Sequence, residues 1–327
     1  MTVATDEFGL IRDYFSDIGS DSTGSVRLSV GDDCAVIAPP SNRDMVVSID
    51  TMVEGTHFPV GTPGDRVASR LLGAALSDLA AMAATPAFFT LALTLPDTNA
   101  IWLRAFSTRL AELARLYGVQ LVGGDTTRGP LTLSIQVHGW TMPDKALLRS
   151  GARPGDRIFV TGTLGDSRGG LETLLKDIHG EQVPFLQHRF FCPEPRLDTA
   201  LLIAPFATAA IDISDGLLAD LNHILDASQV GAMLNPDELP VSDELYHWVG
   251  EEQSRQWALT GGEDFELCFT VPALLEPKLA WALRDHSVAV TCIGQISATP
   301  GIFLAEDGQI WPVAPQGYNH FSDKGSA

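Results

Sequence analysis

The sequence predicts an α/β or α+β protein built as two domains, and three observations support this. The chain has 327 residues, enough for about two domains at roughly 150 residues each. Short β-rich runs alternate with amphipathic helical patterns. A polar segment broken by Pro143, Pro154 and Gly155 separates two such halves, so we place a domain boundary near residue 149, with domains at 1–149 and 150–327.

Two helices are expected in the first half. Residues 67–84 form an Ala-rich helical pattern that we expect Pro86 to end, because proline lacks the amide proton that a helix interior requires. Residues 99–117 carry an apolar stripe of helical period, and Gly118 is the expected C-cap. The expected strands of this half cover residues 45–49, 89–95, 120–122 and 131–140.

The second half begins with a strand over residues 157–161, followed by a glycine-rich turn over 162–170 and a helix. A strand over 209–213 runs into a helix that begins at Leu217. Further strands are expected at 266–271 and 289–293. This order of strands and helices again favours a mixed α and β domain.

The composition excludes several classes of protein. Lysine and arginine number 21 and aspartate and glutamate 41, so the net charge is 21 − 41 = −20, opposite in sign to that of duplex nucleic-acid binders. Charged residues make up 19%, below the usual value of about 25%, which points to apolar surface buried between subunits. The four cysteines form no C-x-x-C pair, so neither a zinc site nor a redox dithiol is indicated.

Targeting and membrane segments are not expected. The N-terminus carries Asp6 and Glu7 and no basic region, unlike a signal peptide. The longest apolar stretch, residues 79–95, is interrupted by Thr85 and Pro86, unlike a membrane span. We therefore expect a cytoplasmic protein that binds neither nucleic acid nor a membrane.

The positions of the carboxylates are the most informative feature of the sequence. Asp78 lies on a helical stripe that should face inward, where a carboxylate is costly unless it is paired or bound to a cation. Oxygen clusters of this kind suit Mg²⁺. Five further segments place acids beside glycine or at the edge of an apolar strand: Gly31-Asp32-Asp33, Ser48-Ile49-Asp50, Gly123-Gly124-Asp125, Asp212 to Asp215, and Gly261 to Asp264.

Each of these features also has a purely structural interpretation. Aspartate and glycine favour turns, Asp215 stands where an N-cap would precede the helix from Leu217, and Asp78 fits an internal salt bridge. Alternatively, glycine lets backbone amides approach a phosphate, at Gly124 after its expected strand or at Ser214 beside a helix N-terminus. The P-loop, G-x-G-x-x-G, protein-kinase and G-x-S-x-G signatures are absent from the sequence. A phosphate-handling function therefore depends on acids and metals.

Nine segments in order give the sequence a specific resemblance to the thiamine-monophosphate kinase family, whose fold is shared with aminoimidazole ribonucleotide synthetase. The resemblance extends from Phe8 to Phe321. No reactive cysteine stands near the N-terminus, which separates the chain from selenophosphate synthetases. The segments are GDDCAV (31–36), EGTHF (54–58), LSDLAAM (76–82), GGDTTRG (123–129), LLRSGARPGD (147–156), VTGTLGDS (160–167), IDISDG (211–216), GGEDFELCFT (261–270) and GYNHF (317–321).

The resemblance implies a role for each matching residue. The implied magnesium ligands are Asp33, Ser48, Ile49, Asp50, Asp78, Asp125, Asp212 and Asp215, and the implied catalytic residues among them are Asp50, Asp78, Asp125 and Asp212. Family members often have threonine where Ile49 stands, so only its backbone carbonyl is available as a ligand. The implied nucleotide contacts are Gly124, Asp125, Arg149 and Ser214, and the implied substrate contacts are His57, Glu263 and Tyr318. Without the resemblance, each of these three residues also has a structural interpretation: His57 as a loop histidine, Glu263 as a turn acid and Tyr318 as a packing aromatic.

The fold that the resemblance implies is a two-domain aminoimidazole ribonucleotide synthetase-like fold, with an N-terminal mixed-sheet α/β domain and a C-terminal α+β domain. A homodimer formed through the N-terminal sheets is implied as well. The implied reaction is transfer of the γ-phosphoryl group of ATP to thiamine monophosphate, assisted by several Mg²⁺ ions. The acceptor oxygen is largely ionised because its second pKa is about 6, so we expect direct in-line transfer without a general base or a phospho-enzyme. Two alternatives stay open: an ATP-dependent ligase of the same fold that acts on a formylglycinamidine-type substrate, and a nucleotide-binding scaffold without turnover.

Overall fold

The computed structural model describes residues 7–19 and 24–318, which form two compact units. Unit 1 holds the residues up to Leu79 together with Ala83–Ala146, and unit 2 holds Ala80–Met82 and the residues from Leu147 on. The boundary expected from the sequence lies near residue 149. Each unit combines helices with a mixed sheet, which confirms the expected fold class.

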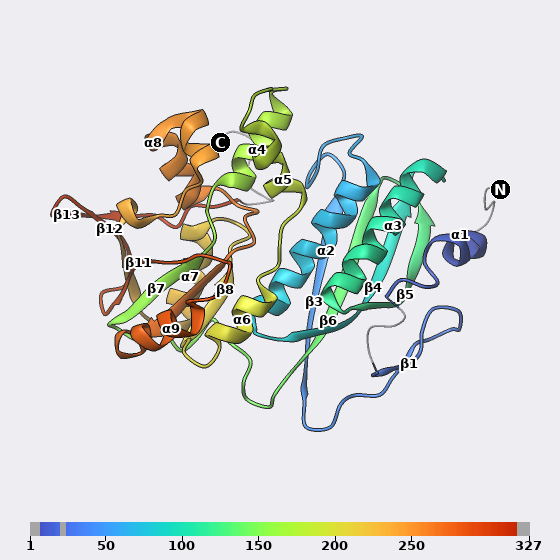
Figure 1. Cartoon of the computed structure of the whole chain (residues 1–327), viewed down its shortest axis with the longest axis horizontal. Helices are drawn as coiled ribbons and strands as arrows, with labels where there is room; N and C mark the ends of the chain where they lie inside the picture. The colour runs from blue at the N-terminus through green and yellow to red at the C-terminus, as the bar shows by residue number, and fades with distance from the viewer. Residues whose placement is uncertain (1–6, 20–23, 319–327) are drawn as a thin grey trace. The chain divides into compact units, whose positions relative to one another are not determined.

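Unit 1 is built on a four-stranded sheet with strand order β3-β6-β4-β5 (Figure 1). Neighbouring strands are antiparallel except for β4 and β5, which are parallel. Its elements are α1 (Glu7–Tyr14), β1 (Val26–Leu28), β2 (Val36–Ile37), β3 (Asp44–Val53), α2 (Gly64–Ala81), β4 (Thr85–Leu95), α3 (Ala100–Tyr117), β5 (Gln120–Arg128) and β6 (Thr132–Thr141). The small pair of β1 and β2 is separate from this sheet.

Helices α2 and α3 lie on one face of the sheet (Figure 1). Apolar side chains that alternate along the strands, such as Phe89 and Leu133, are fully buried against this layer. Arg109 on α3 donates from Nε to the Ser69 hydroxyl on α2 at 2.9 Å, which links the two helices. On the opposite face, β1 and β2 pack over part of the sheet through Val26 and Ile37.

The helix expected over 99–117 is confirmed. Helix α3 has Asn99 as its N-cap, with Oδ1 accepting from the amides of Ile101 and Trp102, and Gly118 as a left-handed C-cap at φ 65°. The expectation for the other helix was wrong at both ends, because α2 starts at Gly64 and stops at Ala81. Ala83 adopts φ 51° there, so the chain turns out of the helix before Pro86, which lies inside β4.

Unit 2 is built on a seven-stranded sheet with strand order β13-β12-β9-β11-β7-β10-β8. Only β9 and β12 are parallel neighbours in this sheet. Its elements are β7 (Asp156–Thr161), α4 (Asp166–Leu175), α5 (Val183–Phe191), α6 (Leu197–Ile203), β8 (Ala209–Asp212), α7 (Leu217–Ser228), β9 (Gly231–Leu234), α8 (Asp243–Thr260), β10 (Leu267–Pro272), α9 (Glu276–Leu283), β11 (Val290–Ser297), β12 (Gly301–Glu306) and β13 (Gln309–Val313). The buried faces of α7, β7, β8 and β11 form its hydrophobic core.

Among residues 7–19 and 24–318, no helix is both long enough and apolar enough to span a membrane.

Candidate active site

In unit 1, three implied metal ligands share one side of the sheet. Ser48 and Asp50 lie in the same alternating row of the edge strand β3 as the buried Val46 and Met52, so their side chains point to the same face. Asp78 lies half-buried on α2, and its Oδ2 accepts a hydrogen bond from the Ser48 hydroxyl. The helical stripe predicted this inward direction for Asp78. The structure thus brings a hydroxyl and a carboxylate together beside a second carboxylate on the same face.

Ile49 points the other way. Its side chain is 62% exposed and lies on the opposite face of β3 with Met45 and Val47. Because neighbouring residues of a strand face opposite sides, this side chain diverges from those of Ser48 and Asp50. The side chain of Ile49 offers no ligand atom, so a metal contact through its backbone carbonyl stays a prediction.

The expectation that strand β5 covers only residues 120–122 was wrong. Strand β5 continues through both glycines to Arg128, and Gly124 is paired with Leu91 of β4. A Cβ on Gly124 would lie only 1.8 Å from the carbonyl oxygen of Leu91. Gly124 is therefore required by the close approach of two strands, and it leaves its neighbour Asp125 exposed on β5.

The sheet register separates Asp125 from Asp50. Asp50 pairs with Ile135 on β6, in the row that ends at Gly124 on β5, whereas Asp125 belongs to the next row and faces the opposite side. Three strand spacings, about 14 Å, lie between β3 and β5. The Asp50 and Asp125 carboxylates of one chain therefore lie on opposite faces of the sheet, about three strand spacings apart.

Asp33 lies on an exposed loop between β1 and β2, and its amide donates to Oδ1 of Asp32 at 2.8 Å. Across the described parts of the chain, no group of three or more His, Cys, Asp or Glu side chains is placed so that it could hold a metal ion. The convergence of the acids on shared ions therefore stays a prediction.

His57 belongs to a well-anchored loop after β3. Its Nδ1 accepts a hydrogen bond from the Val53 amide at 3.0 Å, and its carbonyl oxygen accepts one from Nε of the buried Arg70 at 3.0 Å. An imidazole that accepts at Nδ1 carries its proton at Nε2 when it is neutral. The geometry gives His57 a fixed orientation, which a substrate contact requires.

In unit 2, the implied residues gather on the turn between β8 and α7. Asp212 is the last residue of β8 and is buried, and Ser214 and Asp215 follow it half-buried. The N-cap position of α7 is Gly216, with φ 122° and no side-chain cap, so Asp215 does not cap the helix. Residues 212–215 thus present two carboxylates and a hydroxyl at the end of a buried strand.

Sequence reasoning missed Asp220, which organises this turn. Its Oδ2 accepts hydrogen bonds from the amides of Ser214, Asp215 and Gly216 at 2.9, 2.9 and 3.1 Å. Burial raises the pKa of Asp220 to about 7, and the nearby Asp215 charge adds to the rise. The sequence does indicate that Asp220 is buried, because it follows Leu217 by three residues on the apolar stripe of α7. The backbone amides near Ser214, which are candidate phosphate donors by sequence, donate their hydrogen bonds to Asp220 instead.

Glu263 lies in a strained loop before β10. It has φ 72° and Phe265 has φ 51°, conformations that residues other than glycine rarely adopt. The amide of Glu263 donates to the Ser214 carbonyl at 2.7 Å, and that of Phe265 donates to the Ile213 carbonyl at 2.8 Å. The loop is therefore bonded directly to the turn after β8.

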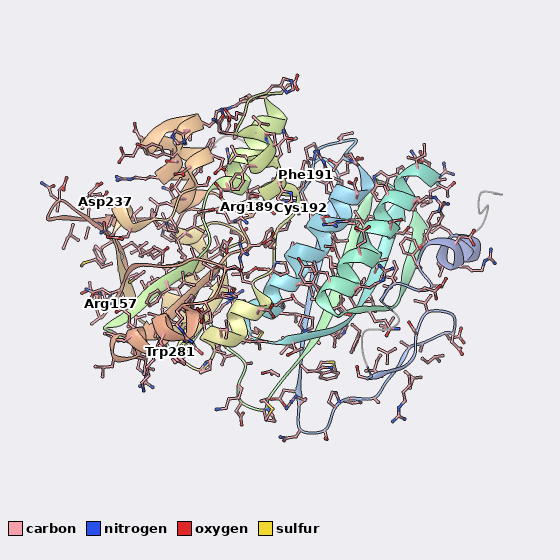
Figure 2. All side chains as sticks on the ribbon, viewed as in Figure 1. Arg157, Arg189, Phe191, Cys192, Asp237 and Trp281 are labelled. Atoms are coloured by element: carbon pink, nitrogen blue, oxygen red, sulfur yellow. The ribbon has the colours of Figure 1, made fainter. Side chains whose placement is uncertain are left out.

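Two buried acids close to Glu263 in the chain, Asp264 and Glu266, anchor this loop through hydrogen bonds. Asp264 accepts hydrogen bonds from the amides of Gly165 and Ser167 at 2.7 and 3.2 Å, at the start of α4. Burial raises the pKa of Asp264 to about 8, and the guanidinium of Arg189 offsets part of that rise. Glu266 is fully buried and accepts from Arg189, labelled on α5 in Figure 2, at 2.8 Å.

Arg196 completes this network by donating from Nε and Nη2 to Glu266 at 2.7 and 2.5 Å. These cations hold the pKa of Glu266 below its usual range, although burial alone would raise it. A buried carboxylate with two guanidinium partners gives the strained loop a rigid support.

The remaining implied residues lie near the same turn or on an exposed segment. The amide of Tyr318 donates to the Asp215 carbonyl at 2.9 Å, and its side chain is 52% exposed, so it is not a core aromatic. Arg149 is exposed, and its carbonyl oxygen accepts from the Ser228 hydroxyl at 3.3 Å. Residues 319–321, the end of the last recognised segment, lie outside the described residues.

Known proteins match this chain consistently over nearly its full length. Residues 31–141 match the family model of the AIR synthase related protein N-terminal domain, and residues 153–306 match that of its C-terminal domain. The thiamine-monophosphate kinase of Escherichia coli K12 is 46% identical over 325 residues, which cover 98% of this chain and 99% of that protein.

Solved structures agree. The crystal structure of thiamine-monophosphate kinase from Stenotrophomonas maltophilia K279a is 38% identical with a TM-score of 0.86, over 94% of this chain and 98% of that chain. AaThiL complexed with AMPPCP and TMP is 31% identical with a TM-score of 0.77, over 96% and 97% of the two chains.

Proposed function

Because the chain belongs to the thiamine-monophosphate kinase family, we propose that it transfers the γ-phosphoryl group of ATP to thiamine monophosphate, forming thiamine diphosphate and ADP. The observation that carries the proposal is 46% identity to an Escherichia coli thiamine-monophosphate kinase along nearly the full length of both chains. The complex of a related chain with AMPPCP and TMP supports the same pair of ligands.

The two alternatives are not favoured. A ligase of the same fold would phosphorylate an amide oxygen, and a scaffold would bind nucleotide without turnover. The curated relatives from Escherichia coli, Haemophilus influenzae and Bacillus subtilis, at 46%, 41% and 34% identity, are all thiamine-monophosphate kinases. A kinase reaction is therefore the reading that the family supports.

Magnesium is the metal that the residues of the site fit. The Ser48 hydroxyl meets the Asp78 carboxylate, and Asp50 shares their face, so the donors on this side are all hard oxygen atoms. The residues that would hold the ions are Asp33, Ser48, Ile49, Asp50, Asp78, Asp125, Asp212 and Asp215. When bound, Mg²⁺ supplies positive charge against the repulsion of two polyanions, which is about 4 kcal/mol for each pair of unit charges 4 Å apart at a dielectric of 20.

The chain itself contributes binding and orientation. Asp50, Asp78, Asp125 and Asp212 have the catalytic role of holding metal at the reacting phosphates. Gly124, Arg149 and Ser214 contact the nucleotide, and the exposed guanidinium of Arg149 pairs with its phosphates. No general base is needed, because the acceptor is already an ionised phosphate oxygen. Transfer is therefore direct and in line, without a phospho-enzyme.

Three residues are assigned to thiamine monophosphate. His57 donates from Nε2, since its Nδ1 already accepts from the backbone. Glu263 places a negative charge, and the half-exposed Tyr318 an aromatic ring, where they attract the cationic thiazolium of the substrate. Residues 1–149 then carry nucleotide and metal binding, and residues 150–327 complete the active site.

The same proposal includes a homodimer in the cytoplasm. The face of the unit 1 sheet that carries Met45, Val47 and Ile49 exposes three apolar side chains, and a second copy would cover them. The four cysteines are free thiols, which suits a reducing compartment where ATP is abundant.

The test is a product assay. The purified protein is incubated with MgATP and thiamine monophosphate, and thiamine diphosphate and ADP are measured by mass spectrometry. Equal amounts of both products support the proposal. ATP turnover only with a formylglycinamidine-type substrate would support the ligase instead.

A further inference from the structure

Asp220 gathers three neighbouring backbone amides onto one oxygen atom. The amides of Ser214 and Asp215 lie 2.9 Å from its Oδ2, and that of Gly216 lies at 3.1 Å. A run of amides like this one forms an anion site, which a carboxylate of the same chain fills here. Hydrogen bonds to a carboxylate are stronger than those between neutral groups, so the turn is held firmly from within.

The hydrophobic core fixes the position of Asp220. The residue is 3% exposed and lies in the first turn of α7, between the buried Leu217 and Leu221. A negative charge at this end of a helix is favourable, because the helix dipole and the first amides attract it. The carboxylate can move only if the packed helix moves with it.

The carbonyl groups of the same turn hold two further residues of the proposed site. Ser214 accepts from the amide of Glu263 at 2.7 Å, and Asp215 accepts from the amide of Tyr318 at 2.9 Å. The approach is close, since a Cβ on Gly262 would lie 2.5 Å from the Ser214 oxygen. The position of the turn at residues 214–216 therefore fixes the positions of four residues, which are Ser214, Asp215, Glu263 and Tyr318.

We infer that Asp220 is a positioning residue for the reaction, which fixes the turn that presents Ser214 and Asp215 and, through its carbonyl groups, Glu263 and Tyr318. The inference rests on the proposed function, which gives those four residues their contacts. Replacement of Asp220 by asparagine keeps one acceptor oxygen but removes the negative charge, so the three amides are held by weaker hydrogen bonds and the turn can shift. Affinity for both nucleotide and thiamine monophosphate then falls, in addition to the rate.

The test compares Asp220→Asn with Asp226→Asn, which alters an exposed acid on the same helix that accepts from Asn222. Binding of AMPPCP with Mg²⁺ is measured by calorimetry, and kcat and KM are measured for ATP and thiamine monophosphate. For Asp220→Asn we expect about tenfold weaker AMPPCP binding and about tenfold higher KM for thiamine monophosphate. The Asp226→Asn control should match the wild type. Asp220→Glu keeps the charge but moves it by one methylene, and it should show the same losses.

Two results would overturn the inference. One is wild-type affinity and wild-type KM values in both Asp220 variants. The other is a lower kcat alone, in proportion to the folded fraction, because a merely destabilised protein has fewer active molecules of unchanged affinity. Failure of the proposed function is distinct: a wild-type protein that binds AMPPCP but does not convert thiamine monophosphate contradicts that function, while the calorimetry still decides the role of Asp220.

Discussion

The hydroxyl of Ser48 donates a hydrogen bond to Oδ2 of Asp78, which joins the edge strand β3 to helix α2. The two residues are 30 positions apart in the chain. Their contact places a carboxylate and a hydroxyl where oxygen ligands can act together, on the same face as Asp50. The proposed metal role of unit 1 depends on this arrangement.

Replacement of Asp78 by asparagine tests that role. Asp78→Asn keeps the shape and an acceptor for Ser48 but removes the charge, so we expect kcat to fall by about 100-fold or more. The unfolding free energy should change by less than about 1.5 kcal/mol, because the side chain is only half-buried. Asp65→Asn, an exposed acid in the first turn of the same helix, is the matched control and should be fully active. Near-normal turnover of Asp78→Asn would contradict the metal role.

His57 is expected to act in substrate binding rather than proton transfer. His57→Ala removes the Nε2 donor and leaves the Val53 amide without its acceptor, so KM for thiamine monophosphate should rise about tenfold while kcat stays within about threefold. Steady-state kinetics across pH check this, with His179→Ala on an exposed segment as the control. A large loss of kcat together with the loss of one limb of the pH profile would identify His57 as a proton-transfer group instead.

Gly124 and its neighbour Gly123 give a matched pair for a stability prediction. A Cβ at Gly124 overlaps the Leu91 carbonyl, whereas a Cβ at Gly123 meets no atom within 4 Å. Gly124→Ala should therefore lower the unfolding free energy by roughly 1–3 kcal/mol or more, and Gly123→Ala should change it by less than about 0.5 kcal/mol. Urea denaturation of both variants measures the difference. Equal stabilities would show that the strands separate easily at this point.

Because the pKa of the buried Asp264 is raised, we expect the unfolding free energy to depend on pH. Its pKa is raised from 3.8 in a model peptide to about 8 in the fold. Between these values the native state keeps a proton that the unfolded chain has released. Its contribution to stability is therefore complete below about pH 4 and is lost as the pH rises through 8, with a slope of up to about 1.4 kcal/mol per pH unit.

Asp264→Asn removes this titration while it preserves the shape of the protonated acid. The unfolding free energy of the variant should fall less steeply from pH 5 to pH 8 than that of the wild type, so the variant gains relative stability at the higher pH. Denaturant unfolding at several pH values provides the measurement. Parallel curves for the two proteins would show that Asp264 is ionised throughout.

Local sequence patterns predicted much of the fold. Helix α3 has an apolar stripe and an end signal at Gly118, and its expected bounds followed from them. Helix α2 lacks such a glycine, and its end depends on the left-handed Ala83, a conformation that the residue type does not indicate. The strand order of either sheet is set by contacts between distant segments, which no local pattern contains.

The same limit applies to the site. The inward position of Asp78 followed from helical periodicity, and the same reasoning applied to α7 would have identified Asp220. The sequence did not show that β5 continues through Gly123 and Gly124. Glycine is favoured both in turns and where two strands approach closely, so the residue type alone does not distinguish the two. Asp50 and Asp125 face opposite sides of the sheet. This relationship depends on how four strands pair, and no local sequence pattern predicts that pairing.

The most direct test of the metal-assisted account is a crystal structure with Mn²⁺ in place of Mg²⁺, together with AMPPCP and thiamine monophosphate. The account predicts anomalous manganese peaks within ligand distance of the carboxylates of Asp50, Asp78, Asp125 and Asp212, with the nucleotide and the acceptor phosphate bound to the same ions. Both ligands bound with no manganese peak beside these aspartates would contradict it.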